Sequence, residues 1–220
     1  MPLIASNEGG YGRRVWPRSA RKIPIMIFDE FLVAQELRGL LTYALRNASG
    51  FAASSVIRYD GVKEHDVGNR RSRVLFDLGP FHSLFQHRLL TFLPRVLQGL
   101  PIAPFPVSSL EIQLTATNDG EFFRAHTDIV DGEIHARQLT FVFFFHGEPR
   151  KFGGGELRIF DKSDHDEPAP ASTDEYQLVY PSQNQIVFFP SWYLHEILPV
   201  KCPSGEFADS RFTLNGWYRR

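Results

Sequence analysis

The stretch LEIQLTATNDGEFFRAHTDIV (residues 110–130) opens the region that decides the fold, because short apolar runs alternate with turns from here onward. The later runs are RQLTFVFFF (137–145), GELRIFD (155–161), YQLVYP (176–181), QIVFFP (185–190) and RFTLNGWY (211–218). Each run has the length of a strand, Gly, Asp and Pro separate the runs, and no helical period joins them. The pattern predicts a mainly β fold, a sandwich or barrel of about seven or eight strands, over residues 109–220.

The chain before this region carries two helical patterns. IMIFDEF (25–31) reads as a short strand and a turn, after which residues 32–46 and then 81–97 repeat apolar side chains at helical spacing. We therefore expect residues 25–108 to form a helical support region packed on the β core of residues 109–220, within one domain overall.

The first residues of the chain differ again in composition. Residues 1–24 are rich in Gly, Arg and Pro, and their basic side chains have no acidic counterpart after Glu8. Such a segment is typical of a basic, flexible arm that is simply solvated, and the alternative is an arm that binds an acidic partner.

Composition bounds the class of protein. The chain has 220 residues, 24 Lys and Arg against 25 Asp and Glu, and a net charge of -1, so neither nucleic acid nor an acidic membrane surface is expected as a partner. Cys202 is the only cysteine of the sequence, which excludes an internal disulfide, a cysteine-rich zinc site and an iron–sulfur cluster. The most apolar stretch, residues 139–145, is far shorter than the roughly 20 residues of a membrane span. With no signal peptide pattern either, we expect a cytoplasmic protein.

One pair of side chains stands out as a candidate metal site. His126 and Asp128 are two residues apart within an apolar run, and side chains at this spacing share one face of a strand. The same spacing recurs at His146/Glu148 and His165/Glu167, but in loop sequence. With His195 further along, two imidazoles and one carboxylate would form a facial triad, a ligand set suited to Fe(II) and also to zinc or manganese.

Arg211 is the second candidate. It begins the last apolar run, where a near-buried charge needs a partner, and Thr213 rather than an acidic residue is its neighbour on the same face. A guanidinium beside a hydroxyl is suited to hold a carboxylate that a ligand supplies. A salt bridge to a distant Asp or Glu explains Arg211 equally well.

Four motifs in this order resemble those of the Fe(II)- and 2-oxoglutarate-dependent dioxygenase superfamily, in its prolyl-hydroxylase-like branch. They are HTD (126–128), GGGEL (153–157), IVFFPSWYLHEI (186–197) and RFTLNGWY (211–218), and the resemblance spans about residues 109–218. It implies a double-stranded β-helix (jelly-roll, cupin-like) core in which His126, Asp128 and His195 bind iron. It also implies that Arg211 holds the distal carboxylate of 2-oxoglutarate with Thr213 beside it, and that Gly154 and Gly155 form a structural turn.

The resemblance implies a hydroxylase. Fe(II), 2-oxoglutarate and O2, with ascorbate as a candidate reductant, would hydroxylate an unactivated C–H of a peptide, a protein residue or a free amino acid and release succinate and CO2. Two alternatives stay open, a β-barrel binding domain without turnover and a cupin-type metal enzyme that does not use 2-oxoglutarate. Related proteins often carry a tyrosine near the H-x-D motif whose hydroxyl contacts the cosubstrate, and here the nearest equivalents are Thr117 and Phe144.

The surroundings of this site yield weaker expectations. Of the 20 phenylalanines, ten lie between residues 122 and 189, so Phe143 and Phe145 are candidates for an apolar lining, although core packing is the commoner role of such rings. Residues 54–73 are expected to form a loop over the mouth of the barrel. Candidate substrate-facing residues are Arg124, Trp192, Tyr193, Asn215 and Trp217, and the candidates in the loop are Arg58, Tyr59, Arg70, Arg71 and Arg73.

Overall fold

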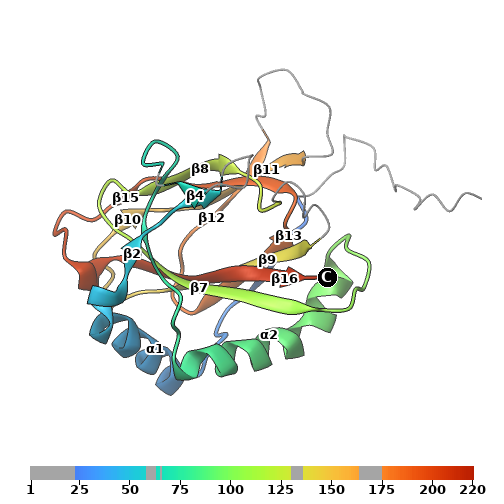
Figure 1. Ribbon diagram of the computed structural model, residues 1–220, viewed down its shortest axis with the longest axis horizontal. Helices are drawn as coiled ribbons and strands as arrows, with labels where there is room; N and C mark the ends of the chain where they lie inside the picture. The colour runs from blue at the N-terminus through green and yellow to red at the C-terminus, as the bar shows by residue number, and fades with distance from the viewer. Residues whose placement is uncertain (1–22, 58–62, 65, 130–135, 164–174) are drawn as a thin grey trace, which may run out of the picture.

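The computed structural model describes residues 23–57, 63–64, 66–129, 136–163 and 175–220. The predicted basic arm, residues 1–24, therefore lies outside the described residues except for its last two positions. Two layers of antiparallel strands face each other, and two helices cover the outer side of the larger sheet (Figure 1).

The larger sheet has seven strands. In spatial order they are β1 (Met26–Phe28), β13 (Gln185–Pro190), β9 (Arg137–Phe145), β16 (Arg211–Arg219), β7 (Ser109–Thr117), β6 (Arg73–Leu75) and β2 (Ala52–Ala53). The longest pairings run from β9 through β16 to β7. The β16–β7 register is continuous, and the β16–β9 register is continuous from Phe212 to Tyr218, with a shift between Tyr218 and Arg219, so the centre of this sheet is regular.

The smaller sheet has five strands, in the order β12 (Tyr176–Val179), β11 (Leu157–Ser163), β14 (Tyr193–Ile197), β8 (Phe122–His126) and β5 (Arg70–Arg71). Two short pairs complete the strands, β10 (Gly153–Gly154) with β15 (Val200–Lys201) and β3 (Val56–Ile57) with β4 (Lys63–Glu64). Two facing antiparallel sheets of this kind make a jelly roll, and the predicted fold class is confirmed.

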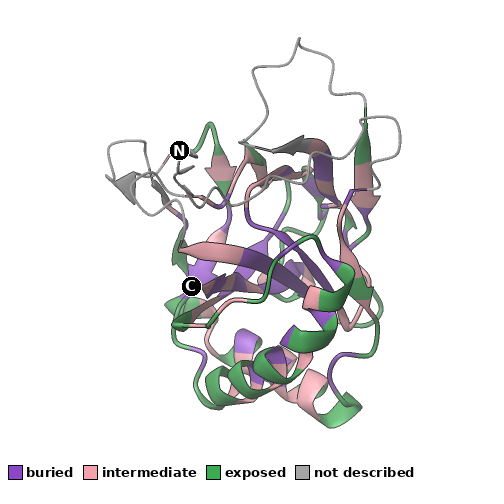
Figure 2. Cartoon of the chain, turned by 90° about the vertical axis from the view of Figure 1, so that its right-hand side faces the viewer, coloured by how far each residue is buried: buried purple, intermediate pink, exposed green. Residues whose placement is uncertain are grey.

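The helices pack as the apolar periodicity predicts. In α1 (Ala34–Arg46) the Glu36 carboxylate accepts the Val33 N–H at 3.0 Å, which satisfies a free donor at the helix start. In α2 (Pro80–Gly99), Pro80 occupies the first turn, and the buried residues are Phe85, Leu89, Leu93 and Val96. In Figure 2 the exposed residues lie on the outer faces of the helices and the buried residues lie toward the sheet. Two short 3-10 turns are η2 (Ala48–Gly50) and η3 (Phe207–Asp209).

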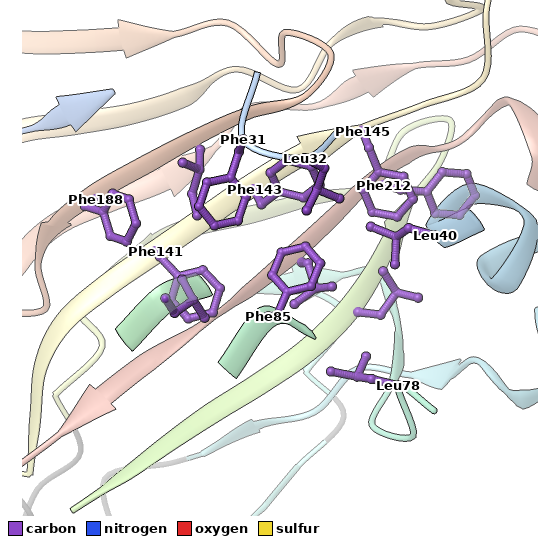
Figure 3. Packing of buried hydrophobic residues seen from close by; sticks show 14 of the residues in the cluster. Phe31, Leu32, Leu40, Leu78, Phe85, Phe141, Phe143, Phe145, Phe188 and Phe212 are labelled. Atoms are coloured by element: carbon purple, nitrogen blue, oxygen red, sulfur yellow. The ribbon is translucent and has the colours of Figure 1, made fainter. Parts of the chain in front are cut away.

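Alternation along β9 separates the two faces of the larger sheet. Phe141, Phe143 and Phe145 belong to the cluster that the helices cover (Figure 3), and the Phe143 ring centre lies 5.4 Å from that of Phe85 on α2. Val142 and Phe144 point the other way, into a second cluster shared with the smaller sheet. Successive residues of a strand face opposite sides of the sheet. The side chains of β9 therefore pack alternately against the helices and into the space between the two sheets.

The front half contributes more than helices. Besides the predicted strand β1, it supplies β2 and β6 to the larger sheet and β5 to the smaller one, strands too short for their sequences to show a period of two. The division at residue 108 stays a prediction. Among the described helices, none is long and apolar enough to cross a membrane.

Candidate metal centre

His126 and His195 lie side by side on neighbouring strands of the smaller sheet. They are register partners in the β8–β14 pairing, and their ring centres are 4.3 Å apart. Asp128 lies between them, with Oδ1 at 3.7 Å from His126 Nε2 and Oδ2 at 3.5 Å from His195 Nε2. One ligand atom from each residue lies within 4.8 Å of the others. The structure thus brings the three predicted ligands together.

One detail of the prediction is wrong. β8 ends at His126, so Asp128 is not on the strand, and strand alternation does not aim its side chain. Instead, the Asp128 N–H donates to the Ser191 carbonyl at 3.0 Å, which holds the turn after β8 against the loop before β14.

Backbone carbonyls fix the tautomer of both histidines. His126 Nδ1 is 2.8 Å from the Arg124 carbonyl oxygen, and His195 Nδ1 is 2.9 Å from that of Tyr193. A carbonyl only accepts, so Nδ1 carries the hydrogen and the Nε2 lone pair is left for a metal. Burial first, and then the neighbouring His195, lower the pKa of His126 to about 3, so this imidazole is neutral at physiological pH.

The Asp128 carboxylate is held ionised from several sides. Thr140 on β9 donates its hydroxyl to Asp128 Oδ2 at 2.7 Å. Burial acts to raise the pKa of Asp128, but His195, His126, Thr140 and the Trp217 indole together lower it below its ordinary value. The Trp217 Nε1 atom is buried and makes no hydrogen bond of ordinary geometry with the described residues. Its N–H group therefore lowers the pKa of Asp128 by lying near the carboxylate.

Arg211 lines the same pocket, and the described residues leave its guanidinium without a hydrogen-bond acceptor. Its side chain is 2% exposed, its guanidinium carbon lies 5.0 Å from the centre of the Phe144 ring, and neither Nε nor Nη2 has a hydrogen-bond partner among the described residues. Burial lowers the pKa of Arg211 to about 9, with Glu156 acting in the opposite direction, so the group is charged at neutral pH. A buried, unpartnered guanidinium is costly unless an anion reaches it.

Gly155 makes room for this arginine. It has a φ of +70°, and a Cβ there would lie 2.6 Å from Arg211 Cδ. At Gly154, with a φ of +67°, a Cβ would lie 2.3 Å from the Pro199 carbonyl oxygen. The two glycines have the structural role expected of them, and Gly155 also borders the pocket's charged group.

Polar side chains of β16 and β7 form the floor of the pocket. Arg211, Thr213, Asn215 and Trp217 alternate along β16 and all line the pocket, which has an empty volume of about 590 Å³ including its open side. Facing them in register on β7 are Thr117, Thr115 and Gln113. The role of Gln113 and Thr115 was missed by sequence reasoning, although the signal existed, because polar residues alternate with Leu114 and Ala116 in QLTAT.

Only some of the residues expected to face the substrate or line the site border the pocket. Asn215, Trp217, Thr117 and Arg70 line the pocket, whereas Arg124, Trp192, Tyr193, Arg71 and Arg73 do not. Phe143 and Phe145 pack in the core between the larger sheet and the helices. Their expected place in the pocket lining is therefore wrong, and the commoner role, core packing, is the one they have. Phe144 stacks near Arg211 without lining the pocket, and the aromatic lining comes from Phe122, Phe123 and Trp217. Arg58 and Tyr59 lie outside the described residues.

The second half of the chain is similar to a known protein family. Residues 112–219 match the family model of the 2OG-Fe(II) oxygenase superfamily. This region is a 2OG-Fe(II) oxygenase domain. An uncharacterized PKHD-type hydroxylase of Synechocystis sp. is 41% identical over 153 residues, which cover 69% of this chain and 50% of the relative. The chain therefore spans about half the length of that relative.

Solved structures share the fold of this oxygenase domain. A Pseudomonas putida prolyl-4-hydroxylase has a TM-score of 0.63 at 21% identity, over 90% of this chain and 94% of that one. A Trichoplax adhaerens prolyl hydroxylase, in complex with a hypoxia inducible factor peptide fragment, has a TM-score of 0.62 at 14% identity, over 89% and 83%.

The superfamily implies Fe(II), 2-oxoglutarate and O2, and the residues of this pocket fit them. Two imidazole Nε2 atoms and one carboxylate are a facial donor set for Fe(II). The unpartnered guanidinium of Arg211 offers the charge that a dicarboxylate needs in a buried site.

Proposed function

We propose that this chain is an Fe(II)- and 2-oxoglutarate-dependent dioxygenase that hydroxylates an unactivated C–H bond, with succinate and CO2 as coproducts. His126, Asp128 and His195 bind the iron, Arg211 binds the distal carboxylate of 2-oxoglutarate, and Thr213 lies beside it. The substrate is a peptide, a protein residue or a free amino acid, as for a prolyl-hydroxylase-like enzyme. The single buried cysteine is consistent with a reducing cytoplasm, the compartment that we propose.

One observation carries the proposal. The three converging ligand atoms and the unpartnered Arg211 guanidinium line the same pocket. A triad alone also suits a metal enzyme without cosubstrate, and an arginine alone also suits a salt bridge. A buried cation with no acceptor among the described residues, next to a metal donor set, is best explained by an anionic cosubstrate that completes the site.

The residues of the chain prepare this chemistry in separate ways. The carbonyls of Arg124 and Tyr193 hold both Nε2 lone pairs toward the centre, and Thr140 holds Asp128 as an ionised ligand. When bound, iron with 2-oxoglutarate and O2 supplies the oxidising power for hydroxylation. The apolar lining residues Val142, Leu157 and Ile197 limit the access of water to the site.

The test separates binding from turnover. Isothermal titration of the Zn(II)-loaded protein with 2-oxoglutarate should give one site, and Arg211→Ala should weaken binding by about 100-fold, since a buried charged hydrogen-bonding pair is lost. The Fe(II)-loaded protein should release succinate. Unchanged 2-oxoglutarate affinity in Arg211→Ala would contradict the proposal.

Arg211→Ala tests one alternative, and succinate release by the wild-type protein tests the other. A cupin-type metal enzyme without 2-oxoglutarate would keep its activity in Arg211→Ala, because Arg211 would have no cosubstrate to hold. A non-catalytic binding domain would bind metal and 2-oxoglutarate but release no succinate with any substrate of a peptide and amino-acid panel.

A further inference from the structure

A second arginine lines the pocket, and the proposed function gives it no role. Arg70 lies on β5, the edge strand of the smaller sheet, opposite Phe123 of β8. Its guanidinium carbon is 4.7 Å from the centre of the Phe123 ring, and its Nε donates to the Ser72 hydroxyl at 3.1 Å. Ser72 in turn donates to Ser54 at 3.0 Å. Stacking and a short hydrogen-bond chain therefore hold the guanidinium plane in place.

The outer nitrogens of this group have no acceptor within the described part of the chain. Nε is occupied by Ser72, but no carboxylate or carbonyl of the described residues accepts from either Nη atom of Arg70. Burial lowers the pKa of Arg70 to about 10, with Asp128 acting to raise it, so the side chain is charged at neutral pH and close enough to Asp128 to interact with it. The arginine thus presents a fixed fork of donors next to the metal centre.

When iron and 2-oxoglutarate are bound, the positive charge of Arg70 is not balanced by a negative charge among the residues that line the pocket. Among the residues lining the pocket, the ionised groups are Asp128, Arg211 and Arg70. The double positive charge of Fe(II) and the double negative charge of 2-oxoglutarate cancel, Asp128 is bound to the metal, and Arg211 is bound to the cosubstrate. One positive charge remains, at Arg70. A substrate that covers the pocket buries this charge, which costs free energy unless the substrate brings an anion.

We infer that Arg70 binds a carboxylate of the substrate, so that the substrate of the dioxygenase proposed above carries an acidic group close to the C–H bond that is hydroxylated. This rests on the proposed function. The carboxylate has two chemical sources, the α-carboxylate of a free amino acid or chain end and the side chain of Asp or Glu within a peptide. Arg70 is then a residue that determines specificity.

The neighbouring arginine provides a matched control. Arg71 follows on the same strand and faces the other way, stacking on Phe122 at 5.6 Å and donating to the Val67 carbonyl at 3.0 Å. It is exposed and does not line the pocket. Arg70→Gln and Arg71→Gln therefore remove the same charge from adjacent positions, only one of which faces the metal centre.

The experiment uses acid and amide pairs as probes. Zn(II)- and 2-oxoglutarate-loaded protein, which does not turn over, is titrated by saturation-transfer NMR with N-acetylproline against N-acetylprolinamide. A second arm uses Ac-Ala-Pro-Glu-NH2 against Ac-Ala-Pro-Gln-NH2. The first pair tests an α-carboxylate and the second a side-chain carboxylate.

In at least one arm the acid should bind about tenfold more tightly than its amide, the size expected for one charged hydrogen-bonding pair. Arg70→Gln should reduce this preference to below about threefold, and Arg71→Gln should keep it. Equal binding of acid and amide, binding of neither, or a preference that survives in Arg70→Gln overturns the inference.

The affinity for 2-oxoglutarate separates this inference from the function on which it rests. It should change less than about threefold in Arg70→Gln, because Arg70 does not hold the cosubstrate. A loss of 2-oxoglutarate binding in Arg70→Gln assigns Arg70 to the cosubstrate and overturns the inference, while leaving the proposed function intact. If wild-type protein binds no 2-oxoglutarate, the proposed function itself has failed.

Discussion

At the scale of single residues, hydrogen bonds on the far side of each ligand make the triad suitable for a metal. The Nδ1 atoms of His126 and His195 are tied to carbonyls, and Asp128 Oδ2 accepts from Thr140. Without these contacts each ring could rotate or change tautomer, and the carboxylate could turn away. The outer partners of ligands therefore contribute to metal affinity without touching the metal.

Thr140→Val tests this contribution with little change of shape. The variant keeps the volume and branching of the side chain but removes the donor to Asp128, so we expect metal affinity to fall by about tenfold or more, as for other outer partners of metal ligands. Competition of Zn(II) with a chromophoric chelator measures it.

Thr115→Val provides the comparison for this variant. Thr115 also lines the pocket, but its hydroxyl donates to Asn215 Oδ1 at 2.9 Å rather than to a ligand. Its substitution should leave metal affinity within about threefold of wild type. Equal losses in the two variants would show that Thr140 has no special role.

At the scale of the element, the two faces of strand β9 lie in different surroundings, one in the helix-covered core and the other in the pocket. The helix-facing side of β9 carries Phe141, Phe143 and Phe145, while Thr140 and Val142 line the pocket. β16 repeats the division, with Phe212 and Leu214 in the core and Arg211 and Thr213 in the pocket. Stability and binding are thus assigned to opposite faces of the same backbone.

Phe143→Leu should change stability and spare the site. Phe143 is fully buried against Phe31 and Phe85, so the smaller side chain should cost about 1–2 kcal/mol of unfolding free energy through imperfect packing. The affinity for 2-oxoglutarate should stay within about twofold. Urea denaturation and isothermal titration measure the two quantities, and a large loss of 2-oxoglutarate affinity would speak against the separation of the faces.

Gly155→Ala should do the opposite and damage the site directly. A methyl group would lie 2.6 Å from Arg211 Cδ, at a φ of +70° that disfavours any residue with a Cβ. We expect a loss of about 1–3 kcal/mol of stability from backbone strain, together with weaker 2-oxoglutarate binding because Arg211 must shift. Gly153→Ala, where a Cβ would meet nothing within 4 Å, is the control and should change neither.

The sequence predicted elements well where one pattern ran long enough. The helices and the long strands follow from periodicity, and the ligands from their contrast with apolar neighbours. β2, β3, β4 and β5 have two residues each, which is too short for the alternation of apolar and polar residues that predicts a strand. The position of Arg70 in the pocket depends on the pairing of β5 with β8. The direction of Phe143 and the turn at Asp128 depend on tertiary contacts, which a single sequence does not specify.

At the scale of the whole molecule, the pocket is where the two sheets meet. The two histidines come from the smaller sheet, Arg211 comes from the larger one, and Thr140 of the larger sheet holds Asp128 from the turn after β8. A metal alone would thus be bound mainly by one sheet. A cosubstrate that reaches both the metal and Arg211 would connect the two sheets and add its binding free energy to the stability of the whole domain.

Thermal unfolding can resolve these two contributions. A ligand at about 100 times its Kd stabilises the folded state by about 2.7 kcal/mol, which for a domain of this size raises the Tm by roughly 5–10 °C. Zn(II) should therefore give one increment and 2-oxoglutarate a second. Arg211→Ala should keep the first increment and lose the second, while Asp128→Ala should lose both, because the cosubstrate needs the metal. Increments are compared within each variant, since removal of a buried side chain also changes the starting Tm. A second increment that survives in Arg211→Ala would show that 2-oxoglutarate is held by one sheet and does not join the two.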